Sequence, residues 1–146
     1  GRDVTIVAVS HMVLEALQAA EALAAEGIEA EVIDPRTFRP LDSGLICRSA
    51  ARTGRLVIAD TGWRSYGVSA EIAARAAEEL WGVLKAPIKR VALPDVPTPG
   101  SSVLEAAYYP GTREIVLAVK QCLQAPAGVA ADGAAPSSRK EFEGPF

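Results

Sequence analysis

Apolar residues along this chain gather in short, almost continuous runs that alternate with longer stretches of helical spacing. Runs of this length, bounded by polar or turn residues, predict β-strands, and the first is so continuously apolar that we expect it to be buried on both faces. The predicted strands are residues 4–9, 28–33, 55–60 and 87–93.

Helical spacing of apolar residues predicts a helix after each strand and one more near the end of the ordered pattern. The predicted helices are residues 12–26, 42–52, 68–81, 103–107 and 112–123. Ser10 and Asp42 are suited to cap the first two helices, and Gly27 and Gly54 are typical helix stops. In the first helix, the apolar positions that follow this spacing are Val13, Leu14, Leu17, Ala20 and Ala24. The alternation of strands and helices predicts a parallel sheet with helices on both faces.

The pattern stops near residue 125. Residues 125–146 are rich in Ala, Gly, Pro and Ser and follow neither the strand nor the helix period, which predicts a flexible linker or tail. We therefore expect one domain over residues 1–124. The last eight residues leave open whether another segment begins there. Because the chain starts with Gly1 and not Met, we expect a fragment or a processed product.

Composition narrows the classes of partner. Apolar residues make up 49% of the chain, charged residues 23%, and the net charge is −3, so we expect no nucleic-acid partner. No apolar run has the length of a membrane span and no signal-peptide pattern opens the chain, so we expect no membrane partner and a cytoplasmic location. Cys47 and Cys122 match no metal spacing, and we expect buried thiols in a reducing compartment.

Residues 60–67 form the best candidate for a functional segment. They follow the third predicted strand, at the edge of the sheet where open α/β proteins place their sites, and they lead into a helix N-terminus, which favours anions. The candidate residues are Thr61, Gly62, Trp63, Arg64, Tyr66 and Gly67. Trp, Tyr and Arg are favoured in interface cores. We therefore rank a subunit interface above a loop that folds one aromatic into its own domain, and both above ligand binding.

Other sites fit the sequence poorly. The first strand-to-helix turn contains no glycine, which excludes a dinucleotide fingerprint and makes Asp34 a structural acid. His11 is the only histidine and has no nucleophile, acid or second metal ligand nearby in sequence. No catalytic arrangement is visible, so we expect no catalysis by this chain alone.

Several segments, in order, resemble one family. The segment Asp34-Pro-Arg-Thr followed by Pro40-Leu-Asp carries most of the likeness, and Thr53-Gly-Arg-Leu-Val and Pro94-Asp-Val-Pro-Thr-Pro add to it. The chain from Asp3 to about Leu123 resembles the transketolase C-terminal domain family, and within it the beta subunit of the E1 component of 2-oxo acid dehydrogenases.

This resemblance implies a three-layer α/β/α sandwich with a mostly parallel sheet of about five strands, one of them antiparallel. It implies thiamine diphosphate and magnesium in the complete enzyme, held by other domain types, and none bound by this chain alone. It also implies contacts with other domains or subunits, a homodimeric contact, and docking of an acyltransferase component. Lys85, Lys89 and Arg90 near the corresponding edge depart from the acidic docking surface of some relatives.

Two function hypotheses follow. The first is a non-catalytic structural and subunit-assembly domain of a thiamine-diphosphate enzyme of the E1 beta or transketolase type. The alternative is a stand-alone regulatory module that binds a small anion near residues 61–67. The substrate of the complete enzyme stays open among pyruvate, a branched-chain oxo acid, acetoin and a sugar phosphate.

Overall fold

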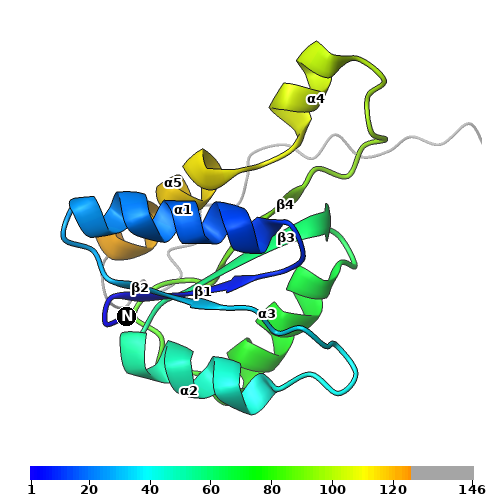
Figure 1. The fold of residues 1–146 in the computed structure, drawn as a ribbon. Helices are drawn as coiled ribbons and strands as arrows, with labels where there is room; N and C mark the ends of the chain where they lie inside the picture. The colour runs from blue at the N-terminus through cyan, green and yellow to red at the C-terminus, as the bar shows by residue number, and fades with distance from the viewer. Residues whose placement is uncertain (126–146) are drawn as a thin grey trace, which may run out of the picture.

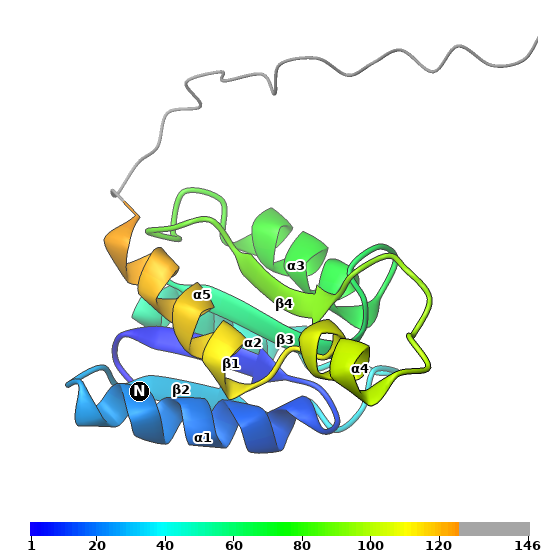
Figure 2. The same ribbon diagram turned by 90° about the horizontal axis from the view of Figure 1, so that it is seen from above.

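The computed structural model describes residues 1–125, which form one parallel sheet between two layers of helices (Figure 1). The strands are β1 (Val4–Ala8), β2 (Ala30–Ile33), β3 (Leu56–Trp63) and β4 (Lys89–Leu93), in the order β2-β1-β3-β4 and all paired in parallel. The helices are α1 (Met12–Ala25), α2 (Ser43–Thr53), α3 (Val68–Glu79), α4 (Ser102–Tyr108) and α5 (Thr112–Gln124). In Figure 1, helices α1 and α5 cover one face of the sheet, α2 and α3 cover the other, and α4 stands apart from both layers; the view from above places α4 near the carboxyl ends of the strands (Figure 2).

The predicted three-layer α/β/α architecture with a parallel sheet is confirmed. The number of strands differs from the expectation of about five with one antiparallel, because residues 1–125 contain four strands, all parallel. The reason lies in the connections: from β1 to β4, each strand is followed by a helix that carries the chain back to the amino end of the sheet, so the next strand must pair in parallel.

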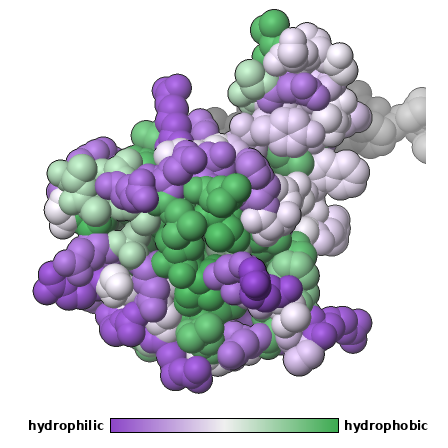
Figure 3. Space-filling model, in the orientation of Figure 1, coloured by the Kyte–Doolittle hydropathy of each residue, from purple (hydrophilic) through white to green (hydrophobic). Residues whose placement is uncertain are grey.

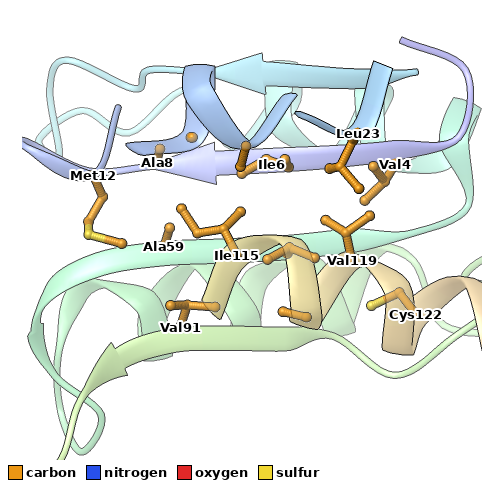
Figure 4. Packing of buried hydrophobic residues seen from close by; sticks show 14 of the residues in the cluster. Val4, Ile6, Ala8, Met12, Leu23, Ala59, Val91, Ile115, Val119 and Cys122 are labelled. Atoms are coloured by element: carbon orange, nitrogen blue, oxygen red, sulfur yellow. The ribbon is translucent and has the colours of Figure 1, made fainter. Parts of the chain in front are cut away.

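Strand β1 lies at the centre of two apolar cores. Val4, Ile6 and Ala8 face α1 and α5, while Val7 faces α2 and α3, and each is fully buried. Figure 4 shows the first core, where Met12 and Leu23 of α1 and Ile115 and Val119 of α5 close over the sheet. The continuous apolar run in the sequence is therefore explained, because alternate side chains enter opposite cores.

The buried stripe of α1 differs from the predicted one. The structure buries Met12, Ala16, Ala19 and Leu23, whereas Leu14 and Leu17 are about half exposed. This helix is apolar around most of its circumference, so spacing alone could not select the stripe. The small side chains of Ala16 and Ala19 let the helix approach the sheet closely, and this packing decides which face is buried.

Most of the predicted helix caps and glycine stops are confirmed. The Asp42 carboxylate accepts a hydrogen bond from the Leu45 backbone N–H at 2.9 Å, and Gly54 ends α2 at φ +74°. Gly27 follows α1 at φ +80°. The prediction for Ser10 was wrong: its φ is +56°, and α1 begins after His11 without a side-chain cap. The Ser10 carbonyl instead accepts the Val13 N–H in a tight turn.

Several boundaries of strands and helices also differ from the predicted ones. The second and fourth strands begin two residues later than predicted, and α3 ends at Glu79 and not at residue 81. The predicted tail, residues 125–146, lies outside the described residues except for Ala125. Among the described helices, none is long and apolar enough to cross a membrane.

Candidate functional site

The candidate segment is in part a continuation of β3. The sequence predicted that the third strand ends at residue 60, but β3 extends through Trp63, so that part of the prediction was wrong. Beyond an irregularity after Ala59, Trp63 pairs with Leu93 of β4, and the Arg64 N–H donates to the Leu93 carbonyl at 2.8 Å. The neighbouring strand thus keeps these residues extended, although their polar and aromatic side chains carry no strand pattern.

A buried carboxylate supports the start of this segment. Asp60 is 3% exposed, and its two oxygens accept the backbone N–H groups of Gly62 at 2.9 Å and Ser69 at 3.0 Å. The second bond ties the first turn of α3 to the end of the core part of β3. A side chain at Gly67 would collide with the Trp63 carbonyl oxygen, so this close turn requires glycine.

Trp63 reaches across to the segment that follows β4. Its indole is 56% exposed, and the ring N–H donates to the Tyr108 hydroxyl at 3.3 Å. The Tyr108 hydroxyl in turn donates to the Val96 carbonyl at 3.0 Å. This chain of bonds connects β3, the connection after β4 and α4. Trp63 is therefore held in place while half of its surface stays open.

Ser65 and Asp95 form a second link between the same two segments. The Asp95 carboxylate accepts the Ser65 hydroxyl at 2.7 Å and the Ser65 backbone N–H at 3.0 Å. These two bonds lower the pKa of Asp95 below its ordinary value. A shallow hollow of about 320 Å³ lies between these two segments, and it is bordered by Trp63, Tyr66, Val96 and Pro97.

Tyr66 occupies the tip of the segment. Its side chain is fully exposed, and its backbone has φ +58°, a conformation that residues other than glycine seldom adopt. Arg64 is also exposed. Its backbone is held in place by a hydrogen bond, because the Arg90 guanidinium donates to the Arg64 carbonyl at 2.7 Å. The tip thus projects an aromatic ring from an ordered support.

Groups that could perform chemistry are not assembled here. Glu15 Oε1 lies 3.5 Å from the Nε2 atom of His11, but Thr112 donates both its hydroxyl and its backbone N–H to the Glu15 carboxylate and lowers the pKa of Glu15. Residues 1–125 contain no cluster of His, Cys, Asp or Glu that could hold a metal ion. Cys47 and Cys122 are buried and free, and burial raises the pKa of the Cys47 thiol to about 11.

The structure brings the predicted residues together at one surface and adds others that sequence reasoning missed. Thr61, Trp63, Arg64 and Tyr66 are exposed, whereas Gly62 and Gly67 are partly covered. The missed residues are Ser65, Asp95, Val96, Pro97 and Tyr108. A signal for most of them was present: residues 94–99 follow the next strand of a parallel sheet, and the carboxyl ends of neighbouring strands meet at one edge.

A second exposed surface lies at the β2 edge of the sheet, on the side away from β4. Figure 3 shows an apolar band down the middle of one face, between α1 and α2. Leu14 and Leu17 on α1 and Leu45 on α2 are among the exposed large apolar side chains. Exposed apolar surface of this kind marks contacts with other proteins or domains.

Comparisons with known proteins identify relatives of the chain. The beta subunit of the mitochondrial pyruvate dehydrogenase E1 component of Dictyostelium discoideum is 46% identical over 124 residues, which cover 85% of this chain and 35% of that protein. The beta subunit of acetoin:2,6-dichlorophenolindophenol oxidoreductase of Cupriavidus necator is 41% identical over 124 residues, covering 85% of this chain and 37% of that protein. The chain thus spans about a third of the length of these relatives.

A comparison with solved structures also finds a related protein. A split-gene transketolase, an inactive beta4 tetramer, aligns with a TM-score of 0.69 and 37% sequence identity, over 84% of this chain and 39% of that one. The family model described as the C-terminal domain of transketolase matches residues 1–115. The likeness seen in the motifs is therefore confirmed, and this chain belongs to the transketolase C-terminal domain family.

Proposed function

We propose that this chain is the C-terminal structural and subunit-assembly domain of a thiamine-diphosphate-dependent enzyme, either a 2-oxo acid dehydrogenase E1 beta subunit or a transketolase-like enzyme. On this proposal it does not catalyse a reaction alone. The observation that carries the proposal is the carboxyl edge of the sheet, where Trp63 and Tyr66 are exposed on an ordered support that contains no assembled acid, base or nucleophile.

Thiamine diphosphate and magnesium belong, on this proposal, to other parts of the complete enzyme. The residues present do not fit them: no metal-ligand cluster occurs within residues 1–125, and no Gly-Asp-Gly segment followed by a metal-ligating Asn occurs in the sequence. The buried Asp60 carboxylate is already occupied by two backbone N–H groups. Titration calorimetry with the cofactor and magnesium should therefore detect no binding to this chain.

The proposed role of Trp63 and Tyr66 is to contact another subunit, first of all a second copy of the chain. A two-fold contact is self-complementary, so the isolated chain should self-associate through these aromatics. Replacing Trp63 by Ala should lower the mass measured by sedimentation while the stability of the monomer changes by less than about 1 kcal/mol. Trp63→Phe, which keeps an aromatic ring but loses the bond to Tyr108, is the matched control and should retain most of the association. Unfolding by Trp63→Ala without a change in association would show that the indole serves the core of its own domain.

Small-anion binding is the weaker alternative because the segment already supplies its own anions. The Asp60 carboxylate takes an N–H group at the start of α3, and the Asp95 carboxylate takes the N–H and hydroxyl of Ser65. A phosphate at this place would meet two carboxylates. Titration with inorganic phosphate separates the alternatives, since saturable binding that Arg64→Ala abolishes would favour the regulatory module.

The proposal extends to partners and location. An acyltransferase component is a further partner, although Lys85, Lys89 and Arg90 require an acidic complement on it. A cytoplasmic location is supported by two buried thiols that do not pair. The choice among pyruvate, a branched-chain oxo acid, acetoin and a sugar phosphate falls to the domains that hold the cofactor.

A further inference from the structure

Strand β4 has one side that no other strand covers. It closes the sheet at the end opposite β2, and within residues 1–125 it pairs with β3 alone (Figure 2). An uncovered strand edge presents backbone N–H and C=O groups that can pair with another extended chain. The outer edge of β4 is therefore a place where a further strand can be added to the sheet.

The pairing with β3 shows which backbone groups of β4 point outward. The Leu93 carbonyl accepts the Arg64 N–H at 2.8 Å, so Leu93 faces β3. In a parallel pair the backbone groups of every second residue point to the same side, so Arg90 and Ala92 turn their N–H and C=O groups away from β3. The Arg64 guanidinium agrees with this direction, because it reaches the Arg90 carbonyl from outside the sheet, at 3.5 Å.

A basic groove of about 430 Å³ runs along this edge, between β4 and α5. Leu117 and Ala118 of α5 give it an apolar wall, and Leu117 is 47% exposed. Arg64, Lys89 and Arg90 also line the groove. None of these three cations forms an ion pair with a side chain of residues 1–125.

Two acids in this region are already engaged by other groups. Glu114 lines the groove, and its carboxylate accepts the Gly111 N–H at 2.9 Å. Asp95, just beyond the end of β4, accepts both the hydroxyl and the N–H of Ser65. The groove therefore combines uncovered backbone groups with positive charge that its own chain does not pair.

We propose that the outer edge of β4 binds an extended acidic segment of another protein, which adds a strand to the sheet. The backbone of this segment pairs with Arg90 and Ala92. Its acidic side chains meet Lys89 on one face and Arg90 on the other, because consecutive residues of a strand point to opposite faces. An apolar side chain of the segment covers Leu117. The proposal does not rest on the contact proposed for Trp63.

The Arg64 guanidinium changes partner when the segment binds. Its distance of 3.5 Å to the Arg90 carbonyl is at the long limit for a hydrogen bond, so an N–H group of the incoming strand replaces it. The displaced guanidinium is then free to pair with a carboxylate of the segment, which is the stronger bond.

The same cations argue against a second copy of this chain at the β4 edge. Two β4 edges paired about a two-fold axis would bring Lys89 and Arg90 of one copy against those of the other, and like charges directly opposite are destabilising. Cations on an edge strand also discourage pairing with neutral strands. An acidic segment satisfies the backbone groups and the charges together.

Amide exchange in the full 146-residue chain tests strand addition, with the blocked peptide Glu-Val-Glu-Glu-Val-Glu as probe. This sequence places acids on both faces of an extended strand. Saturable binding at peptide concentrations up to about 1 mM should slow exchange of the Arg90 and Ala92 amides about tenfold or more. The Val91 amide, which faces β3, should change little. Absence of binding, or binding that leaves the Arg90 and Ala92 amides unprotected, overturns the proposal.

Charge variants test whether the site is local. Lys89→Gln removes one cation of the groove and should weaken peptide binding about threefold or more. Arg113→Gln, at an exposed position of α5 outside the groove, is the matched control, because it removes the same charge and should leave the affinity unchanged. Equal losses for the two variants would mean that the peptide responds only to net charge, and the β4 edge would not be its site.

A backbone variant tests the pairing itself. Ala92→Pro removes one outward N–H group, and proline is tolerated on an edge strand where that group faces solvent, so circular dichroism should show a folded chain. The peptide should then bind about tenfold more weakly, and unchanged binding to the folded variant contradicts strand addition. Peptide binding reports on the β4 edge and sedimentation of Trp63→Ala on the Trp63 segment, so either proposal can fail alone.

Discussion

The two halves of β3 belong to one strand but have opposite surroundings. From Leu56 to Asp60 every residue is buried between helices of both layers, whereas Thr61 and Trp63 are exposed. In the first half, the strand pairs with both β1 and β4, and helices cover it. In the second half, the strand is paired with β4 alone. A single strand thus supplies packing at one end and a recognition surface at the other, and the change occurs at the buried Asp60.

The largest expected effect is at the centre of the buried half. Ile58 is fully buried in the core beneath α2 and α3, so Ile58→Ala should reduce the free energy of unfolding by about 2–5 kcal/mol, through lost apolar contact and the cavity left behind. Denaturant unfolding measures this. Ile58→Val, the control, should cost about 0.5–1.5 kcal/mol. A loss for Ile58→Ala no larger than that for Trp63→Ala would remove the distinction between the halves.

The next effect tests the junction. Asp60→Asn keeps one acceptor oxygen but leaves either the Gly62 or the Ser69 N–H without its partner, so we expect a loss of about 1–3 kcal/mol in unfolding free energy. Asp42→Asn is the matched control, because Asn caps a helix as well as Asp and should change stability little. Equal effects of the two substitutions would mean that burial of the Asp60 carboxylate does not matter.

A smaller effect, of opposite sign, is expected at the tip. Tyr66 has a left-handed backbone and an exposed side chain, so Tyr66→Gly should leave the monomer unchanged or stabilise it by up to about 1 kcal/mol. Thermal unfolding at low protein concentration measures this, and association should weaken at the same time. Thr61→Gly, where the backbone is not left-handed, should instead destabilise the monomer slightly. Destabilisation by Tyr66→Gly would show that the ring packs on its own domain.

The smallest effect concerns pH. The bonds from Ser65 lower the pKa of Asp95 in the folded chain, so their contribution is present above the ordinary value of 3.8 and is lost as pH falls through the lowered pKa. Amide exchange at Ser65 should therefore accelerate as the pH falls below 3.8, relative to amides in Leu56–Asp60. Asp95→Asn should remove this pH dependence. Equal acceleration in both halves of β3 would indicate general unfolding.

Parts of this picture could be predicted because they depend on neighbouring residues. The apolar run from Val4, the capping carboxylate of Asp42 and the glycine stop at Gly54 each act within a few residues, and all were found where expected. The exposed position of Trp63 and Tyr66 agreed with the expectation of a surface segment. Their role in an interface stays a prediction.

Other parts depended on which segments meet in space. The extension of β3 to Trp63 needs Leu93 of β4 beside it, and the link from Ser65 needs Asp95, thirty positions away in sequence. The buried stripe of α1 was decided by how closely Ala16 and Ala19 approach the sheet, since several stripes of that helix are apolar.

The sequence by itself determined the order of strands and helices, the parallel sheet and the family, because these follow from apolar periodicity, capping residues and local motifs. Only the tertiary structure decided that Trp63 is bonded to Tyr108 and that Trp81 lies in the open beside a groove. The physical reason is that an aromatic ring gains as much by packing inward as by meeting a partner, and the space left by other elements determines which of the two occurs.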